Sequence, residues 1–187
     1  MKLTIQEELL MPFPVSRIHW RVGATNQAKT SGIALAYIDA RDVMQRLDEI
    51  FGLGGWQCRY NLADNGLLIC EIGIKLGDEW IWRANGAGDT QVEAEKGKAS
   101  DAFKRAGVMF GIARYLYSLP NEWVNIQAAG RSWKLSQRPS LPTWATPEGY
   151  REIIMRRRAE ATFEEAEPLE GDPIQELTER IKLKELD

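Results

Sequence analysis

The chain has 187 residues, of which 44% are hydrophobic, and this length allows one substantial core with extensions. Its net charge of -3 combines a mildly basic body with an acidic end, because residues 159–187 hold ten acidic and three basic residues and leave a net charge of +4 on residues 1–158. No apolar run approaches the roughly 18 residues of a membrane-spanning helix, and the first ten residues lack the residue order of a signal peptide, so we expect a cytoplasmic protein without a membrane contact.

Few residues are available for metal or nucleophilic chemistry. Two cysteines, Cys58 and Cys70, are too few for a disulfide framework, and the single histidine, His19, does not complete a common zinc set with them. With one histidine, a Ser-His-Asp catalytic set is not a credible interpretation. We therefore expect both thiols to pack as small apolar groups and His19 to be structural.

The first expected elements are a buried strand and a helix. An irregular, proline-containing opening precedes residues 33–38, IALAYI, whose apolar run suits a buried strand. Asp39 then has the position of a helix N-cap, with Asp42 at the third helical position and Gly52 as the terminator. One buried helix face is expected from residues at helical spacing: Val43, Met44, Leu47, Ile50 and Phe51.

Residues 56–85 predict an antiparallel meander of three strands. Residues 56–62, 67–75 and 79–85 each alternate with a period of two, and Asn65-Gly66 between the first two is a strong hairpin signal. The apolar face is expected to hold Trp56, Cys58, Tyr60, Leu62, Leu68, Cys70, Ile72, Ile74, Trp80, Trp82 and Ala84. The opposite face, with Arg59, Glu71, Lys75 and Arg83, is either a solvated surface or part of a charged groove.

A long helix is expected from Gln91 to about Tyr117. Its apolar stripe consists of Val92, Ala99, Phe103, Ala106, Phe110, Ala113 and Tyr117. At 100° per residue, Lys98, Asp101 and Arg105 cluster on the opposite side, while an intermediate line holds Gly97, Lys104, Gly107 and Gly111. Glycines and a cation are therefore expected to be neighbours on this helix.

The C-terminal part has a different character. Residues 139–147 hold three prolines and look like a linker, and residues 149–167 predict a surface helix that ends at the following proline. Residues 174–186 are interpreted as a short amphipathic helix or as disorder. We expect two parts, a core domain at residues 1–138 and a linker with an acidic tail at residues 139–187.

Three kinds of chemistry can be compared. Residues 97–100, GKAS, resemble the end of a P-loop, but the upstream glycine is absent and the segment lies inside a helix, which argues against a nucleotide triphosphatase. Acidic residues offer two possible Mg2+ sets, Asp39 with Asp42 and Glu49, or Asp89 with Glu93 and Glu95. Helix capping and solvated helix faces explain the same carboxylates without a metal.

The third kind is binding to a phosphate backbone. Lys98, Lys104 and Arg105 on one helix supply positive charge, and charge neutralisation of phosphates needs no catalytic residue. Glycines beside these cations leave room for the close approach of a ligand or of a packed strand. On chemistry alone, a solvated helix face with glycines packed on the sheet is the leading interpretation of the pattern.

Two blocks of the sequence resemble the Rad52/22 family of DNA single-strand annealing proteins, in its short phage form. Residues 34–57, ALAYIDARDVMQRLDEIFGLGGWQ, are similar to the family's strand, helix and G-x-x-x-W closing. Residues 86–117 are similar to its long helix with D-x-x-K-R-A and F-G elements, and Ile18 to Arg21 agree with an I-x-W-R opening. With the meander between the blocks, the resemblance covers about residues 10–125.

The resemblance implies an α+β fold in which the three-stranded meander is packed by the long helix, a β-β-β-α core with flanking helices, that assembles into rings or helical oligomers. It implies a basic groove around the assembly that holds single-stranded DNA, with no nucleotide cofactor, no metal and no covalent catalysis. The family's Lys-Arg pair in the groove corresponds to Lys104 and Arg105. An earlier lysine of the same helix corresponds approximately to Lys96 or Lys98.

Three positions depart from the family pattern. The family's groove arginine in the first helix falls on Asp42, so Arg41 is the nearest substitute. An aromatic residue in the glycine-rich turn becomes Leu53, and a further arginine after the Lys-Arg pair becomes Val108. The central pair is present.

The leading hypothesis is therefore ATP-independent annealing of single-stranded DNA in homologous recombination and repair, by a phage-encoded oligomer in the host cytoplasm. The competing hypothesis is a metal-dependent nuclease acting on DNA ends, with Asp89, Glu93 and Glu95 as ligands. A third is a mediator whose acidic segment from Glu160 onward docks a single-strand-binding, replication or repair protein. The same segment can instead compete with DNA for the groove or aid solubility.

Overall fold

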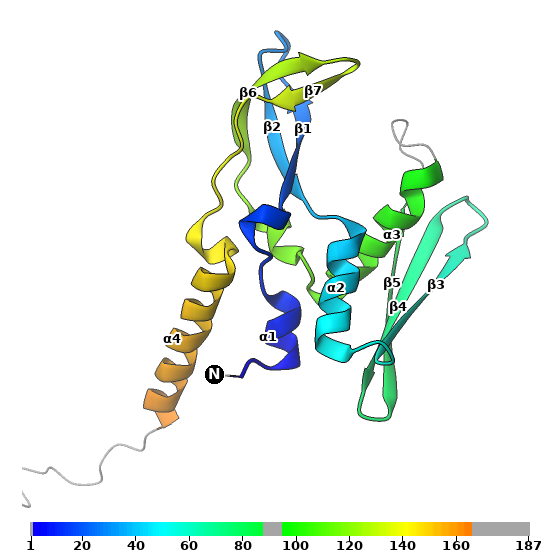
Figure 1. Cartoon of the computed structure of the whole chain (residues 1–187), viewed down its shortest axis with the longest axis vertical. Helices are drawn as coiled ribbons and strands as arrows, with labels where there is room; N and C mark the ends of the chain where they lie inside the picture. The colour runs from blue at the N-terminus through cyan, green and yellow to red at the C-terminus, as the bar shows by residue number, and fades with distance from the viewer. Residues whose placement is uncertain (1, 88–94, 166–187) are drawn as a thin grey trace, which may run out of the picture. The chain divides into compact units, whose positions relative to one another are not determined.

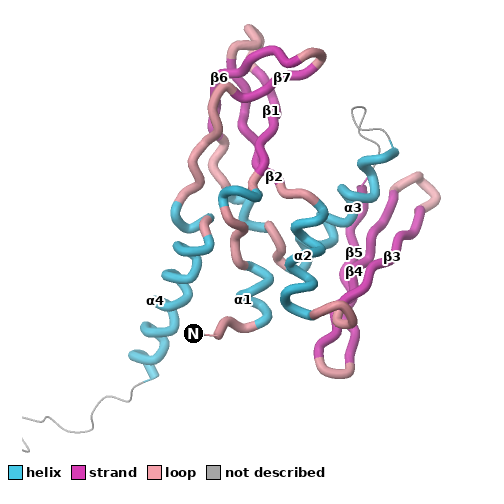
Figure 2. Tube along the Cα trace, in the orientation of Figure 1, coloured by secondary structure: helices cyan, strands magenta, loops and turns pink. Residues whose placement is uncertain are grey.

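The computed structural model describes residues 2–87 and 95–165, which divide into two compact units between Tyr150 and Arg151. The larger unit contains two antiparallel sheets and the helices that pack with them (Figures 1 and 2). This arrangement confirms the α+β class expected from the sequence.

The N-terminal segment forms a short helix that a buried arginine holds in place. Helix α1 (Ile5–Leu10) ends where the guanidinium of Arg46 donates hydrogen bonds to the carbonyl oxygens of Glu8 (2.7 Å) and Met11 (2.8 Å). The same guanidinium lies 4.3 Å from the centre of the Phe13 ring. The sequence indicated only an irregular opening here, because six residues are too few to show helical periodicity.

One sheet has four strands in the order β1-β2-β6-β7. It consists of β1 (His19–Thr25), β2 (Ser31–Tyr37), β6 (Glu122–Ala129) and β7 (Ser132–Leu135), with all neighbours antiparallel (Figure 2). The expected strand at residues 33–38 is confirmed as β2. The sequence analysis did not identify β1, β6 or β7, whose partly exposed residues alternate only loosely.

Helix α2 (Ala40–Phe51) follows the sequence prediction at both ends. Asp39 is the N-cap, and its backbone N–H donates to Oδ2 of Asp42 at the third helical position (2.9 Å). Gly52 ends the helix with a φ of +70°. The expected apolar face is confirmed, with Val43 and Leu47 buried and with Met44, Ile50 and Phe51 packed beside them.

The three-stranded meander is confirmed as β3 (Trp56–Leu62), β4 (Leu68–Leu76) and β5 (Glu79–Ala87). Residues 68–74 of β4 present the buried side chains of Cys70, Ile72 and Ile74 to the core. The turn between β3 and β4 contains Gly66, which has a φ of +79°. The Asn65-Gly66 signal therefore identified this hairpin correctly.

The face assigned to β5 was wrong. In the observed register Arg83 lies opposite the buried Ile72, and Trp82 lies opposite Gly73 on the outer face. Trp80, Trp82 and Ala84 therefore share the outer face with Arg59 and Glu71, and Arg83 does not. The turn between β4 and β5 consists of two residues, since Leu76 pairs with Glu79. The sequence analysis suggested a turn of three residues. A difference of one residue in the pairing moves every side chain of the strand to the other face of the sheet.

Helix α3 (Glu95–Phe110) packs on β4 and β5 and approaches α2 closely (Figure 1). A Cβ atom placed on Gly107 would lie 2.7 Å from Cγ1 of Val43, so the two helices meet where α3 has no side chain. Phe103 and Ala106 are fully buried as expected, but Ala99 is exposed and Ala102 is buried in its place. Gly107 therefore serves a helix contact, not the sheet contact that the sequence suggested.

The helix ends earlier than the expected Tyr117. Gly111 has a φ of +105°, its N–H donates to the carbonyl of Val108, and the N–H of Ile112 donates to the carbonyl of Gly107. This hydrogen-bond pattern is a Schellman motif, which stops an α-helix. A separate 3-10 turn (Arg114–Ser118) follows, and it leaves Tyr117 exposed. The expected start at Gln91 and the stripe residue Val92 lie outside the described residues.

The main core joins α1, α2, α3 and the inner face of the meander. Its fully buried members come from α2, β4, α3 and the turn that follows α3: Val43, Leu47, Cys70, Ile72, Ala102, Phe103, Ala106 and Ile112. Because the core includes both helices that carry the candidate cations, core packing fixes where those cations lie.

The C-terminal part of the described chain is helical. A 3-10 turn (Thr143–Ala145) contains the fully buried Ala145, and α4 (Pro147–Glu165) confirms the helix expected from residue 149. The expected end at Pro168 and the segment 174–186 lie outside the described residues, and the boundary at residue 138 stays a prediction. In the parts of the chain that are described, no helix combines the length and apolar character of a membrane span.

We expect Gly107→Ala to lower the free energy of unfolding by about 1–3 kcal/mol, because the added methyl group overpacks against the stiff Val43 side chain. This cost outweighs the gain of about 1 kcal/mol that alanine brings to a helix. Urea unfolding measures the change, and Gly54→Ala is the control because its Cβ would have no neighbour within 4 Å. The cost should shrink in a Val43→Ala background, and an equal cost in both backgrounds would contradict the contact.

Candidate functional site

Two of the four candidate cations of α3 lie together around one carboxylate. Arg105 Nε lies 3.0 Å from Oδ2 of Asp101, and Lys104 Nζ lies 3.9 Å from Oδ1 of the same residue. The exposed fractions of the two side chains are 49% and 29%, respectively. Both cations are therefore accessible, and their shared partner holds them side by side without burying them.

The other two candidates do not join this pair. Lys98 Nζ donates a hydrogen bond to the carbonyl oxygen of Gly66 (3.1 Å), in the turn between β3 and β4. This bond ties α3 to the hairpin that it covers, so Lys98 has a structural contact of its own. Lys96 lies in α3, but its side chain is outside the described residues.

Lys104 is connected to the base of the four-stranded sheet through two aromatic rings. Its Nζ lies 5.9 Å from the centre of the Tyr37 ring, at the end of β2. The Tyr37 ring in turn lies 5.4 Å from the ring of His19, its cross-strand partner at the start of β1. The sequence gave no sign of this role for Tyr37, because the residue ends an apolar run that reads as core.

From His19 the row of contacts continues to the N-terminus of α2. His19 Nε2 lies 3.6 Å from Oδ2 of Asp39, and Nη2 of Arg41 lies 3.7 Å from the same oxygen. The Arg41 side chain is 86% exposed. We use the name cationic strip for this row, which contains Arg41, Asp39, His19, Tyr37, Lys104, Asp101 and Arg105.

The strip brings together three of the five residues that the sequence singled out. Arg41, Lys104 and Arg105 belong to it, although they come from two helices that are more than 60 positions apart in the chain. Asp42, on which the resemblance placed the family's groove arginine, is buried. It accepts hydrogen bonds from the Asp39 N–H and from Nη1 of Arg17 (3.2 Å), a residue that the sequence analysis did not identify.

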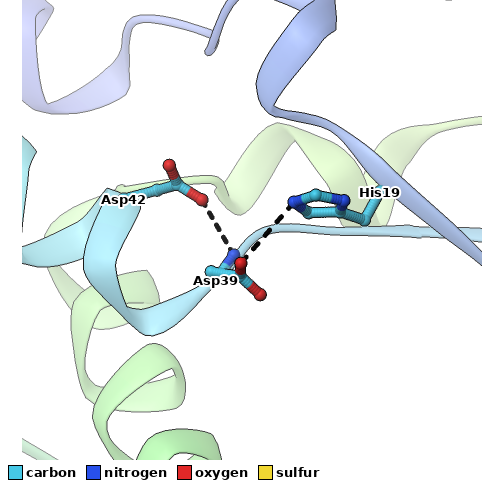
Figure 3. Close-up of side chains that lie close together, drawn as sticks. All are labelled: His19, Asp39 and Asp42. Atoms are coloured by element: carbon cyan, nitrogen blue, oxygen red, sulfur yellow. Dashed lines mark hydrogen bonds and ion pairs between the residues drawn. The ribbon is translucent and has the colours of Figure 1, made fainter.

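The same region contains one group of side chains with metal-ligand chemistry among the described residues. One ligand atom each from His19, Asp39 and Asp42 lies within 4.8 Å of the other two (Figure 3). However, the carboxylate of Asp42 already accepts from Arg17 and from the helix cap, and that of Asp39 lies beside Arg41. Two guanidinium groups next to two carboxylates leave little net negative charge for a divalent cation.

The other Mg2+ sets receive no support from the described residues. Glu49 accepts a hydrogen bond from the side chain of Gln45 on the exposed face of α2, apart from the Asp39 cap. Asp89, Glu93 and the side chain of Glu95 lie outside the described residues. The nuclease hypothesis therefore stays untested at its own residues.

The outer face of the meander holds a cation that is already paired. Arg59 forms an ion pair with Glu71 on the neighbouring strand, and its guanidinium lies 4.2 Å from the centre of the Trp82 ring. The Trp82 ring covers Gly73, since a Cβ atom there would lie 2.9 Å from three ring atoms. The side chains of Arg59, Glu71 and Trp82 on the outer face therefore contact one another. Lys75 on β4 is an exposed cation of the same face.

The two thiols differ in their surroundings. Cys70 is fully buried, and burial raises the pKa of its thiol to about 11. Cys58 is exposed on β3, which corrects the expectation that both thiols pack in the core. Partial burial also raises the pKa of Cys58, so neither thiol is activated as a nucleophile.

Comparison with known proteins identifies the family to which the sequence is similar. The sequence model of the Rad52/22 family, described as double-strand break repair protein, matches residues 2–133. The single-stranded DNA-binding protein DdrA of Deinococcus radiodurans is 36% identical over 151 residues, which cover 79% of this chain and 71% of that protein. DdrA of Deinococcus deserti is 32% identical over 160 residues, which cover 79% of this chain and 73% of that protein.

We expect millimolar Mg2+ or Mn2+ to leave the melting temperature unchanged, because the oxygens of Asp39 and Asp42 already have cationic or N–H partners. Thermal unfolding with and without each ion measures this, with Asp39→Asn as the comparison. A rise in melting temperature that Asp39→Asn removes would show that the group binds a metal after all.

Proposed function

Because the chain belongs to the Rad52/22 family of double-strand break repair proteins, we propose that it binds single-stranded DNA along the cationic strip and anneals complementary strands. The observation that carries the proposal is the unbroken row of contacts from Arg105 and Lys104 on α3 to Arg41 on α2. The two DdrA relatives are single-stranded DNA-binding proteins, which supports the same function here.

The chemistry of the strip suits a phosphate backbone. Each Lys or Arg that neutralises a phosphate releases condensed counterions, and this contribution is independent of base sequence. Phosphate contacts position a strand but leave its base edges free, which annealing requires. The proposal needs no nucleotide cofactor and no covalent step.

Asp101 has a defined part in this proposal. It holds Lys104 and Arg105 in place in the free protein and must share them with a phosphate when DNA binds. An exposed ion pair of this kind contributes about 0–1 kcal/mol, so a phosphate can replace it at little cost. Asp101 therefore positions the cations and moderates their affinity at the same time.

Assembly into a ring or filament belongs to the same proposal. A few cations per subunit bind a strand weakly, whereas repeated copies of the strip bind one strand in many places. Gel filtration tests this point, because a monomer would remove the repeated sites on which the affinity depends. The phage source that the resemblance implied stays a prediction, since the two relatives named above are Deinococcus proteins.

We expect the double substitution Lys104→Ala with Arg105→Ala to abolish single-stranded DNA binding and annealing at physiological salt while the oligomer remains. At low salt, where residual binding is measurable, two lost phosphate contacts should reduce the slope of log K against log salt by about 1.4 for each subunit that contacts the oligonucleotide. Fluorescence titration of a labelled oligonucleotide at several salt concentrations measures both effects. Strands incubated with Mg2+ should be recovered uncut, and cleavage would favour the nuclease hypothesis.

The control is Arg131→Ala with Lys134→Ala, which removes the same charge from the β6–β7 hairpin. Equal losses in both double variants would mean that only net charge matters.

Asp101→Asn changes the charge of the strip in the opposite direction and should tighten DNA binding. Weaker binding by Asp101→Asn would show that positioning of the cations outweighs the competition.

Deleting residues 159–187 tests the proposed role of the acidic segment as a docking site for a single-strand-binding or replication protein. We expect DNA affinity to stay the same and binding to that partner to be lost, because the segment has a net charge of -7 and contains none of the proposed DNA contacts. Tighter DNA binding after the deletion would instead identify the segment as an electrostatic competitor.

A further inference from the structure

Arg17 is an exposed arginine that α2 holds in a fixed position. It ends the 3-10 turn (Val15–Arg17) that leads into β1. Its Nη1 donates to Oδ1 of Asp42 (3.2 Å), and its Nη2 donates to Oε1 of Gln45 one turn further along α2 (3.1 Å). Two hydrogen bonds from separate nitrogens fix both the place and the plane of the guanidinium.

The burial of the two partners is unequal. The side chain of Asp42 is 4% exposed, whereas that of Arg17 is 51% exposed. The carboxylate is therefore fixed inside the protein, and the guanidinium faces solvent above it. A buried carboxylate is a costly way to stabilise a surface arginine, since burial of its charge must be compensated by its partners.

The guanidinium keeps donors that the protein does not use. An arginine side chain has five N–H donors, and the described residues accept from two of the nitrogens of Arg17 in the two bonds above. The planar arrangement of the remaining donors matches the oxygens of a phosphate. An arginine fixed in advance also loses less conformational freedom when it binds such a ligand.

The location of Arg17 connects it to the cationic strip. The carboxylate oxygen of Asp42 lies within 4.8 Å of both the His19 ring nitrogen and the Asp39 carboxylate, which belong to the strip. Arg17 therefore lies beside the end of the strip where Arg41 is found. The positive surface then extends from α3, past the base of β1 and β2, to the turn that precedes β1.

We propose that Arg17 is a further phosphate contact for single-stranded DNA, and that buried Asp42 and Gln45 are its positioning residues. The inference rests on the proposed function, since it places one more cation in the same binding surface. It also gives Asp42 a role: a carboxylate stands where the family has a groove arginine, and it presents the arginine of another segment to the same surface.

The decisive variant is the double substitution Arg17→Gln with Asp42→Asn. It leaves the net charge of the protein unchanged and leaves no unpaired buried carboxylate, and the amide oxygen of the new asparagine can still accept the Asp39 N–H. We expect the slope of log K against log salt for a labelled oligonucleotide to fall by about 0.7 for each subunit that contacts it, the value for one phosphate contact on a single strand. A purely structural ion pair predicts the wild-type slope in this variant, and that result would overturn the inference.

Two further variants complete the test. Arg131→Gln removes an exposed arginine from the β6–β7 turn and should leave the slope at the wild-type value. Arg17→Lys keeps the charge and should retain most of the slope, and a slope as low as that of the double variant would count against a phosphate contact. The melting temperature of each variant reports folding independently of DNA.

The outcomes separate this inference from the proposed function. If the wild-type protein does not bind single-stranded DNA, or if Lys104→Ala with Arg105→Ala has no effect, the cationic strip itself is refuted. If that pair matters and the Arg17→Gln with Asp42→Asn variant keeps the wild-type slope, only the role of Arg17 is refuted.

Discussion

The close approach of α2 to α3 at Val43 and Gly107 is the contact on which the candidate site depends. The N-terminus of α2 carries Arg41 and the cap residues, and α3 carries Lys104 and Arg105. These side chains belong to one surface because the Val43 side chain of α2 packs against the backbone of α3 at a glycine. A larger residue at position 107 would separate the helices and, with them, the two ends of the strip. In this protein the packing of α2 against α3 in the core therefore also determines the distances between the cations on the surface.

Short sequence signals correctly predicted the structural features that depend on a few adjacent residues. Asp39 and Gly52 identified both ends of α2, and Asn65-Gly66 identified a hairpin, because caps and tight turns depend on a few adjacent residues. The phase of β5 depended on the length of one turn, and the end of α3 depended on Gly111, which lies within an otherwise continuous helical pattern. Strands β1, β6 and β7 were missed because their partly exposed residues alternate only loosely, and the pairing of β2 with β6 joins residues far apart in the chain.

In the candidate site as well, residues in a recognisable sequence motif could be predicted, and residues placed by tertiary contacts could not. The Lys-Arg pair was singled out because it matches the family resemblance, and Arg41 because it is the neighbour of a position that departs from it. Tyr37 and Arg17, in contrast, owe their positions to contacts with distant elements. Carboxylates organise this surface: Asp101 holds two cations on α3, and Asp39 lies between His19 and Arg41. The family resemblance alone suggests that the aspartate at position 42 is the loss of a positive charge. The structure gives it two partners, a helix cap and an arginine.

The difference between the two thiols has a practical consequence. Cys58 is accessible on β3, while Cys70 is enclosed in the core and its high pKa leaves almost no thiolate at neutral pH. A maleimide dye should therefore attach to one position of the unmodified protein, on a strand that contributes nothing to the surface holding Lys104 and Arg41. Energy transfer from that dye to a labelled oligonucleotide would follow the encounter of protein and strand in real time, without any substitution in the chain.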